Sequence, residues 1–433
     1  MQNIAVIGAG YVGLVTAAAL AETGNRVLCV DSDTEKIRKL RKGSVPIYEP
    51  GLDKIILKNK KLKRLLFSTS IKEATVSAQI IFICVGTPSR QDGSADLSAV
   101  QKVSQEIARN IREYKVIVEK STVPAETGEK IKRTIEMNNP GGVSFDVVSN
   151  PEFLREGSAM QDAFHPDRIV LGVASERAEK IMRQLYKPFK APIVATSINT
   201  AELIKHACNS FLATKISFIN AIANVCEKID ADVEKVALAM GLDTRIGKEF
   251  LRPGIGFGGS CFPKDVDAFI HLAAQKGYDF ELLKAARKIN QERKDVFIKK
   301  IEEALWIIKD KTISVLGLSF KPDTDDIRSS VAIDIVRLLL GAGAKVKVYD
   351  PKAMERAKSL LKGATFCDNP YEAVRKSDCM AILTEWQEFK ELDLKKIKKI
   401  LRQPVIIDGR NMFDPQQMRA MGFVYKSIGR SGK

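Results

Sequence analysis

The sequence predicts an α/β protein with two parallel β-sheets, one near each end of the chain, joined by a central helical region. Buried-strand patterns occur at residues 3–8 and 312–318, and each is followed by a strand that ends at an aspartate, Asp31 or Asp350. Between them, a long helical pattern from about residue 200 to 242 is apolar on several sides. At 433 residues and 45% hydrophobic, the chain is long enough for two or three domains with filled cores.

The first strand leads into a GxGxxG turn at Gly8, Gly10 and Gly13, which opens a helical pattern through Glu22. Strand, glycines, helix, strand and terminal Asp31 stand in the order of a Rossmann-like, doubly wound domain. A carboxylate at Asp31 can accept hydrogen bonds from a ribose and would repel a 2′-phosphate, which favours NAD over NADP. Lys36, one turn into the next helix, can contact the ribose or a phosphate. A lone GxGxxG motif would be weak evidence for a dinucleotide site, but the complete set in this order is strong evidence.

Three further strands, at residues 79–85, 115–120 and 145–149, run into C-V-G-T-P, S-T-V-P and N-P-E-F-L-R-E-G. Ligands of open α/β sheets bind outside the carboxyl ends of strands, so these loops should line one cleft. Any one loop can equally be a plain turn, because Gly and Pro routinely mark strand ends. The polar residues that make the ligand reading stronger are Thr87, Thr122, Glu152, Arg155 and Glu156.

The glycine-rich stretch F-L-R-P-G-I-G-F-G-G-S-C-F-P-K-D, residues 250–265, leads straight to Cys261 and an amphipathic run. Cys261 is therefore predicted at or just before a helix N-terminus, where helix amides and Lys264 would stabilise a thiolate. An inert cysteine in a surface loop is the alternative. Lys205 and Asn209 are four apart and share one helix face, although singly they read as a solvated lysine and an incidental asparagine.

Charge and cysteine usage narrow the functional class. The net charge of +16 is spread along helix faces such as 58–64 and 395–402, without an arginine-rich tail, which favours a solvated surface over nucleic-acid binding. No apolar run is long enough to span a bilayer and no signal peptide is recognisable, which predicts a cytoplasmic protein without a membrane partner. The seven cysteines lack CxxC spacing, so no metal site or disulfide framework is expected. With three histidines, proton transfer should rest on carboxylates and lysines.

The second sheet repeats the opening layout in altered form. Gly317 stands where Gly8 stood, but Ser319 and Pro322 replace the next two glycines, in a loop crowded with charges around Lys321. Such a loop should not hold a dinucleotide in the usual way, but it can hold a different nucleotide through Lys321. Strands at 379–383 and 404–408 complete this domain, and residues 429–433 are predicted to be disordered.

These segments, together with A-E-L-I-K-H-A-C-N and L-S-F-K-P-D-T-D-D-I-R, resemble the UDP-glucose/GDP-mannose dehydrogenase family over nearly the whole chain. The chain departs from that pattern after Arg328, where Ser329 and Val331 replace the common Glu and Pro. The resemblance implies an NAD-binding Rossmann domain at 1–198, a central helical dimerisation domain at 199–305, and a Rossmann-like UDP-sugar-binding domain at 306–433.

The resemblance also implies a reaction, the oxidation of the C6 alcohol of UDP-glucose to UDP-glucuronate with two NAD⁺. Cys261 would be the nucleophile that holds the half-oxidised sugar as a thiohemiacetal and then a thioester. Lys205 and Asn209 would stabilise oxyanions, and Asp265 with Thr122 would position or deprotonate water. Glu152 is a candidate base for thioester hydrolysis.

By position, the implied NAD contacts are Gly8, Gly10, Tyr11, Val12, Gly13, Asp31, Lys36, Thr87, Thr122, Glu156, Lys264 and Arg328. The implied substrate contacts are Glu152, Phe153, Leu154, Arg155, Glu156, Lys205, Asn209, Phe250, Leu251, Arg252, Pro253, Gly254, Gly258 and Lys321. Arg245 would reach the substrate of the neighbouring subunit in a homodimer.

Three alternatives stay open at this point. The same chemistry can act on GDP-mannose or a UDP-N-acetylhexosamine, because base and sugar recognition depend on pocket shape. A single-step alcohol dehydrogenase would leave Cys261 a structural residue. A non-catalytic nucleotide-sugar sensor or nucleic-acid binder is disfavoured, because Cys261, Lys205, Asn209 and Asp265 are all present.

Overall fold

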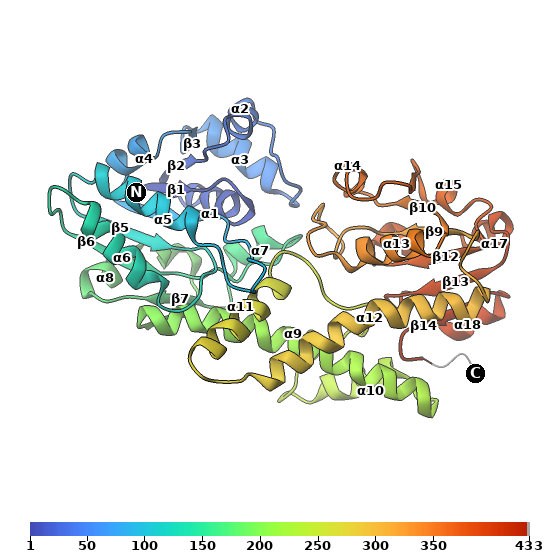
Figure 1. Ribbon diagram of the computed structural model, residues 1–433. Helices are drawn as coiled ribbons and strands as arrows, with labels where there is room; N and C mark the ends of the chain where they lie inside the picture. Colours follow the sequence, from blue (N-terminus) through green and yellow to red (C-terminus); the bar gives the residue numbers. More distant parts are fainter. Residues whose placement is uncertain (431–433) are drawn as a thin grey trace. The chain divides into compact units, whose positions relative to one another are not determined.

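The computed structural model describes residues 1–430 and divides the chain into two compact units, each built on one β-sheet (Figure 1). Unit 1 consists of Met1–Cys208 and Asp267–Tyr278, and unit 2 consists of Asn209–Val266 together with the chain from Asp279 onward. Two of the boundaries fall inside helices, α9 (Ile198–Ile229) and α11 (Phe262–Gln275), and the third, after Tyr278, falls in the loop that follows α11.

The sheet of unit 1 has eight strands in the order β3-β2-β1-β4-β5-β6-β7-β8. The first six are parallel, with Ile4 of the central strand opposite both Val27 and Ile80. Strand β7 runs antiparallel to β6, with Ser149 opposite Gly172. The strands are β1 (Asn3–Ile7), β2 (Arg26–Val30), β3 (Leu65–Ser68), β4 (Ile80–Ile83), β5 (Lys115–Glu119), β6 (Phe145–Ser149), β7 (Ile169–Gly172) and β8 (Ile193–Thr196).

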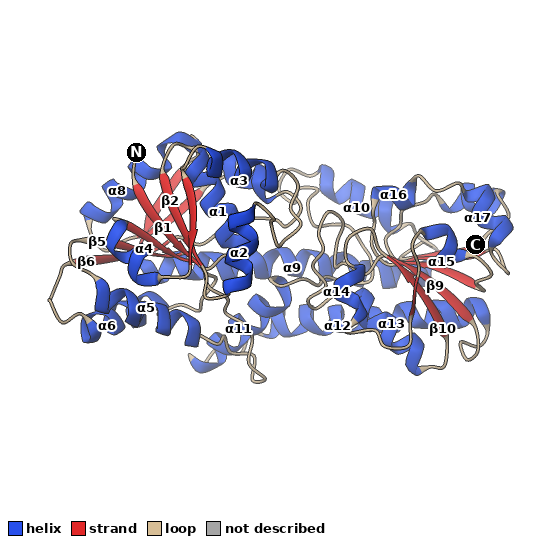
Figure 2. Cartoon of the chain, turned by 90° about the horizontal axis from the view of Figure 1, so that it is seen from above, coloured by secondary structure: helices blue, strands red, loops and turns tan. Residues whose placement is uncertain are grey.

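Helices cover both faces of this sheet (Figure 2). One face packs against α1 (Tyr11–Glu22), α2 (Thr34–Lys42), α3 (Leu52–Lys61), α7 (Ala159–Phe164) and α8 (Glu176–Tyr186), which the short helix η1 (Lys187–Phe189) follows. The other face packs against α4 (Ile71–Ser77), α5 (Ser98–Asn110) and α6 (Thr127–Asn138). Because both faces are covered, the central strands are apolar at almost every position, as parallel sheets require.

The sheet of unit 2 has six parallel strands in the order β11-β10-β9-β12-β13-β14, which is the order of the first six strands of unit 1. They are β9 (Thr312–Leu316), β10 (Lys345–Tyr349), β11 (Thr365–Phe366), β12 (Cys379–Ile382), β13 (Val405–Asp408) and β14 (Val424–Ser427). The prediction of two doubly wound parallel sheets with a helical region between them in the chain is confirmed.

Helices also lie on both faces of the second sheet. On one face are residues of α9 with α10 (Val233–Leu242), α12 (Glu281–Leu305), α13 (Val331–Gly341) and α14 (Met354–Lys358). On the other are α15 (Pro370–Val374), α16 (Gln387–Lys390), α17 (Leu394–Ile400) and α18 (Pro415–Ala420). In the part of the chain from 1 to 430, no helix combines the length and apolar character needed to cross a bilayer.

Two sequence-based expectations were wrong. The helical pattern from 200 to 242 is interrupted, because Asp230 adopts φ +60° and Asp232 caps a new helix by accepting the Glu234 N–H at 2.8 Å. Gly429 and Arg430, expected to be disordered, are ordered: the Gly429 N–H donates to Glu227 Oε1 at 2.7 Å, and Arg430 forms a β-bridge. The rest of that prediction, 431–433, lies outside the described residues.

Candidate active site

The glycine turn of unit 1 leaves room for a ligand at the start of α1. A Cβ on Gly13 would lie 1.8 Å from the Gly8 carbonyl oxygen, so helix and strand meet there only because residue 13 is glycine. At Gly10, by contrast, an added Cβ would meet no atom within 4 Å. The N-terminus of α1 has no side-chain cap, so the amides of Tyr11 and Val12 point to an open space. These features fit the pyrophosphate of a dinucleotide.

Asp31 is fixed for the same ligand. Its carboxylate accepts the N–H groups of Ala9 at 2.8 Å and Asp33 at 3.0 Å, and Lys36 Nζ lies 2.9 Å away. Burial alone would raise the pKa of the Asp31 carboxyl, but these amides and the ammonium outweigh burial and hold the pKa below its ordinary value. The side chain keeps 12% exposure, so it remains an ionised acceptor at the surface of the turn.

The loops after β4 and β5 are tied together and to α9. Thr87 Oγ1 donates to the Thr122 carbonyl at 2.8 Å, as expected for neighbouring strand ends. On the other side of the Thr122 loop, His206 Nε2 lies 2.9 Å from the Val123 carbonyl. Glu202 of the same helix accepts the Gly128 N–H at 2.7 Å. The helix that carries Lys205 therefore holds the loop that carries Thr122.

Glu152 and Lys205 form a buried ion pair in unit 1. Glu152 Oε1 lies 2.9 Å from Lys205 Nζ, and each side chain is 4% exposed. The second oxygen, Oε2, accepts the Leu154 N–H at 2.6 Å. Phe153 follows Glu152 in the sequence, and the centroid of its ring lies 5.3 Å from Lys205 Nζ and 3.7 Å from the Arg168 guanidinium. A buried pair fixed this firmly is a poor source of stability and a typical feature of a reactive site.

Glu49 is a site residue that the sequence reasoning missed. Its buried carboxylate binds the Tyr11 hydroxyl and accepts the N–H groups of Gly157 and Ala159, each at 2.7 Å. It thereby joins the first turn of α1 to the end of the loop that carries Glu152 and the half-buried Glu156. The segment I-Y-E-P-G gave no signal for this role beyond the resemblance to a turn.

In unit 2, Cys261 directly precedes α11, as predicted, and its carbonyl accepts the Asp265 N–H at 2.8 Å. Its thiol is half-buried, 3.6 Å from Ser260 Oγ. Asp265 is fully buried and fixed from two sides, with Asn209 Nδ2 and Lys264 Nζ each 2.6 Å from one carboxylate oxygen. The structure thus brings Asn209, Lys264 and Asp265 together beside the turn that begins at Cys261.

The loop before Cys261 is held by buried polar side chains. Gly254 donates to Asn220 Oδ1 at 2.8 Å and accepts from Arg293 Nε at 3.0 Å, while Asn290 bonds both backbone groups of Phe257. A Cβ on Gly258 would lie 2.3 Å from the Ser329 carbonyl oxygen, so the loop lies directly against the segment after Arg328. The glycines of this loop are required by packing and do not indicate mobility.

Other predicted ligand residues have different partners within their own units. Arg155, Arg245 and Arg328 are exposed and bind Asp162, Asp243 and Asp326 respectively. Lys321 lies 5.6 Å from the centroid of the Phe320 ring. Leu251, Pro253 and Gly254 are buried, Arg252 is exposed, and Phe250 has φ +64° with its ring 5.9 Å from that of Phe262.

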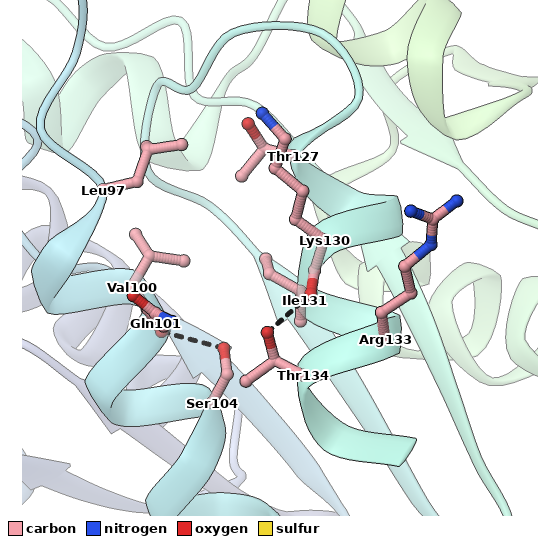
Figure 3. Close-up of a pocket in the computed structure, with 9 residues that line it drawn as sticks. All are labelled: Leu97, Val100, Gln101, Ser104, Thr127, Lys130, Ile131, Arg133 and Thr134. Carbon is pink, nitrogen blue, oxygen red and sulfur yellow. Dashed lines mark hydrogen bonds between the residues drawn. The ribbon is translucent and has the colours of Figure 1, made fainter. Parts of the chain in front are cut away.

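A hollow of about 350 Å³ between α5 and α6 lies apart from these residues (Figure 3). Its floor is apolar, and the hydroxyls of Ser104 and Thr134 in its wall donate to backbone carbonyls of their own helices. The lining residues are Leu97, Val100, Gln101, Ser104, Thr127, Lys130, Ile131, Arg133 and Thr134. None is a predicted site residue. Among residues 1–430, no group of His, Cys, Asp and Glu could hold a metal ion.

Comparison with known proteins agrees with this arrangement. Three models of the UDP-glucose/GDP-mannose dehydrogenase family match: the NAD binding domain at residues 2–190, the central domain at 199–292 and the UDP binding domain at 314–415. The chain is 49% identical to UDP-glucose 6-dehydrogenase TuaD of Bacillus subtilis, over 99% of this chain and 94% of that protein. It is 46% identical to a UDP-glucose 6-dehydrogenase of Rhizobium meliloti, over 99% and 100%.

Among solved structures, a UDP-glucose dehydrogenase from Pyrobaculum islandicum superposes with a TM-score of 0.94 and 39% identity, covering 99% of this chain and 98% of that one. A UDP-D-ManNAc dehydrogenase from Pyrococcus horikoshii gives 0.89 and 30%, covering all of both chains. The glycine turn with Asp31, the Glu152–Lys205 pair and the Cys261 turn all lie within the matched domains. The chain therefore belongs to the UDP-glucose/GDP-mannose dehydrogenase family.

Proposed function

We propose that this protein oxidises UDP-glucose to UDP-glucuronate with two NAD⁺, as a UDP-glucose 6-dehydrogenase. The observation that carries the proposal is the half-buried Cys261 thiol at the start of α11, beside the Asn209–Asp265–Lys264 cluster, in a chain so close to enzymes of that name. A nucleophilic thiol is what distinguishes four-electron oxidation from a simple alcohol dehydrogenase, because the aldehyde must be retained between two oxidations.

The residues divide the chemistry as follows. The glycine turn and Asp31 would hold NAD⁺, which would supply the hydride acceptor for each oxidation. Lys205 and Asn209 stabilise the oxygen of the sugar as it gains negative charge. The Cys261 thiolate adds to the aldehyde, and loss of the second hydride from that adduct leaves a thioester. Water then attacks the thioester, giving the carboxylate and the free thiol. Glu152 takes the proton from this water, while Asp265 and Thr122 position it.

The remaining assignments are proposals on the same footing. The NAD ligands are those of the glycine turn together with Asp31, Lys36, Thr87, Thr122, Glu156, Lys264 and Arg328. The substrate ligands are residues of the 152–156 and 250–258 loops, together with Lys321. Of these, Lys321 lies in the UDP binding domain. We place the domain boundaries after residues 198 and 305. A cytoplasmic location is supported by the seven cysteines, which form no disulfide.

We also propose a homodimer through the central helix. In unit 2, α9 exposes Phe211, Phe218, Val225 and Ile229, which recur at helical spacing along one stripe. Phe211 is 65% and Ile229 68% exposed. A contiguous exposed apolar stripe of this kind is typical of a protein–protein interface. Arg245, 87% exposed, is free of the core and suited to reach the partner's substrate. A Phe218→Glu variant should elute as a monomer in light-scattering chromatography. A dimer that persists would contradict this surface.

The function itself is tested by stoichiometry. UDP-glucose should yield two NADH per molecule, and Glu152→Gln incubated with UDP-glucose and NAD⁺ should show a covalent adduct on the Cys261 peptide by mass spectrometry. Cys261→Ser should form no acid. One NADH per sugar, or acid formation by Cys261→Ser, would contradict the thioester route.

Substrate choice needs a separate panel, because the structural likeness to a UDP-D-ManNAc dehydrogenase is also close. UDP-glucose, GDP-mannose and UDP-N-acetylhexosamines should be compared by kcat/KM at one NAD⁺ concentration. Turnover of an N-acetylhexosamine without turnover of UDP-glucose would replace our first choice and leave the chemistry intact.

A further inference from the structure

Lys120, which directly follows β5, has an unusual set of partners. Its Nζ lies 3.0 Å from Asn150 Oδ1 and 3.2 Å from the Asn150 carbonyl oxygen. The Tyr186 hydroxyl donates to the same Oδ1, and Asn150 Nδ2 donates to the Val170 carbonyl at 2.8 Å, which fixes the orientation of the amide. The ammonium is therefore bound by two neutral oxygens of one residue. No ion pair of Lys120 with a carboxylate occurs within residues 1–430.

Asn150 begins the turn that leads to Glu152. The Asn150 N–H donates to the Glu119 carbonyl at 2.8 Å, so β6 and β5 remain paired up to this point. Two residues later, Glu152 meets Lys205 at 2.9 Å, and its other oxygen is held by the Leu154 N–H at 2.6 Å. The turn is thus fixed at its far end by Leu154 and at its near end by the two hydrogen bonds from Lys120.

Burial and the neighbouring charges set the pKa of the Lys120 ammonium. Burial lowers the pKa of Lys120 to about 8, Cys84 and Glu152 act against that change, and Lys205 adds to it. Besides these three, the titratable neighbour is Tyr186, whose ring centroid lies 6.0 Å from Nζ. Lysines in proteins are usually exposed or paired with a carboxylate, whereas this half-buried ammonium is bound by neutral oxygens at the cost of its own proton affinity, which points to a use for the charge.

We propose that Lys120 is a positioning residue for Glu152: its ammonium, bound to both oxygens of Asn150, holds the turn that presents Glu152 to Lys205. The proposal rests on the role of Glu152 given under the proposed function. It assigns Lys120 no contact with the substrate or with NAD. Because Glu152 acts in the chemical step, the loss in kcat should exceed any change in KM that arises from the 152–156 loop.

The sign of the pH effect follows from the charge. The ammonium form predominates below the pKa of Lys120 and is lost as the pH rises through about 8, so kcat should fall on that side as the charge-assisted hydrogen bonds to the two Asn150 oxygens weaken. Removal of the charged group should abolish this step in the profile. A carboxylate in place of the Asn150 amide should raise the pKa of Lys120 and shift the step to higher pH.

The experiment compares Lys120→Met, Lys120→Arg and Asn150→Asp with the wild type, by kcat, KM and their pH profiles in the intact enzyme. Lys120→Met should lose about 10- to 100-fold in kcat, with KM for UDP-glucose and NAD⁺ changed less than about threefold. Lys120→Arg should recover part of the loss. Asn150→Asp should move the alkaline step upward by about one pH unit or more.

Lys115 provides the matched control, because it is a buried lysine at the other end of β5 that pairs with Glu113 at 2.9 Å. Lys115→Met should lower the melting temperature and keep the wild-type kcat and pH profile. If Lys120→Met keeps the wild-type kcat and profile while Glu152→Gln is impaired, the proposal is overturned and the function stands. Equal kcat losses in both lysine variants would also overturn it. An unimpaired Glu152→Gln would overturn the role of Glu152 and this proposal together.

Discussion

The two sheets share one strand order, and in both an aspartate follows the second strand of the order, yet the two aspartates have different surroundings. Asp31 in unit 1 keeps 12% of its side chain exposed and accepts from two backbone amides and Lys36. Asp350 in unit 2 is 1% exposed and accepts from the backbone and hydroxyl of Ser319 and from the Trp386 indole at 3.1 Å. Three further amides bind the same carboxylate.

This difference teaches how one architecture can serve two purposes. In unit 1 the acid is left accessible beside an open glycine turn, which suits a ribose. In unit 2 the Trp386 indole and the Ser319 hydroxyl donate to the carboxylate oxygen that a ribose would need. The hydrogen bonds of Asp350 therefore stabilise the fold of its own unit. The replacement of the second and third glycines by Ser319 and Pro322 predicts the loss of dinucleotide binding. The burial of Asp350 is the physical reason, because a buried carboxylate cannot bind a ribose.

The sharpest test of the comparison is at Gly13, where an added Cβ would overlap the Gly8 carbonyl oxygen. Gly13→Ala should destabilise unit 1 by more than about 3 kcal/mol and abolish NAD⁺ binding, measured by thermal melting and by NAD⁺ titration. Gly10→Ala is the control, because its Cβ meets no protein atom; it should melt like the wild type and still bind NAD⁺ more weakly. A Gly13→Ala protein with wild-type melting would break the packing argument.

The two aspartates can be exchanged for asparagine in parallel. Asp350→Asn would face an amide NH₂ toward N–H donors, and it should cost about 2–4 kcal/mol of stability in urea unfolding while KM for NAD⁺ stays unchanged. Asp31→Asn should leave stability within about 1 kcal/mol and weaken NAD⁺ binding about tenfold. If Asp350→Asn changed NAD⁺ binding as much as Asp31→Asn, the distinction between the two folds would fail.

Buried acids also differ between the units. Burial raises the pKa of Glu202 to about 7 against three opposing backbone hydrogen bonds, and its Oε2 has no hydrogen-bond partner. A carboxyl whose pKa is raised on folding stabilises the fold at low pH, and this stability is lost as the pH rises from about 4.5 through about 7. Glu202→Gln should match the wild type near pH 5 and be more stable by about 1–3 kcal/mol at pH 8.

The measurement for Glu202 is urea unfolding at several pH values, followed in unit 1. Glu106→Gln, an exposed acid of α5, should follow the wild-type curve. In unit 2 the buried Asp408 also has a raised pKa from burial, but Tyr425 and three backbone amides bind it, so no orphan oxygen is left there. A Glu202→Gln variant destabilised at every pH would show that the carboxyl is needed for packing and not strained by charge.

The smallest expected effect is at Trp386, which is 6% exposed. Trp386→Phe removes the single indole N–H that Asp350 and Ser319 share and should cost about 1–2 kcal/mol, with NAD⁺ kinetics unchanged. The check is a melting curve beside an NAD⁺ titration. A change in KM for NAD⁺ would mean that this indole influences the first nucleotide site, contrary to the comparison.

The parts of the fold that local patterns specify were predictable from the sequence. The glycine turn, Asp31 and the start of α11 after Cys261 each depend on residues within one turn and its flanking elements. The break at Asp230 was missed, because the apolar pattern continues across it and only a left-handed backbone and the Asp232 cap reveal it. The strands β3, β7, β8, β11 and β14 were also missed, and all five lie at or next to an edge of their sheet.

The parts of the site that depend on distant partners could not be predicted. Glu49 lies in a turn-like segment, and its function as an anchor requires the amides of Gly157 and Ala159, more than a hundred residues away. Lys120 directly follows a strand, where a lysine side chain usually extends into solvent. Its hydrogen bond to Asn150, thirty residues away, could not be inferred from the sequence. The predicted roles of Arg155, Arg245 and Arg328 stay predictions, since each binds a neighbouring aspartate in this structure.

The distribution of thiols has a practical consequence for chemical labelling. Cys29, Cys84, Cys226, Cys367 and Cys379 are buried, and burial raises the pKa of each, so an alkylating reagent at neutral pH should leave them intact. Cys208 and Cys261 are the half-exposed pair that remains. A fluorophore could thus be attached at the reactive position after one substitution, Cys208→Ser, without constructing a cysteine-free background.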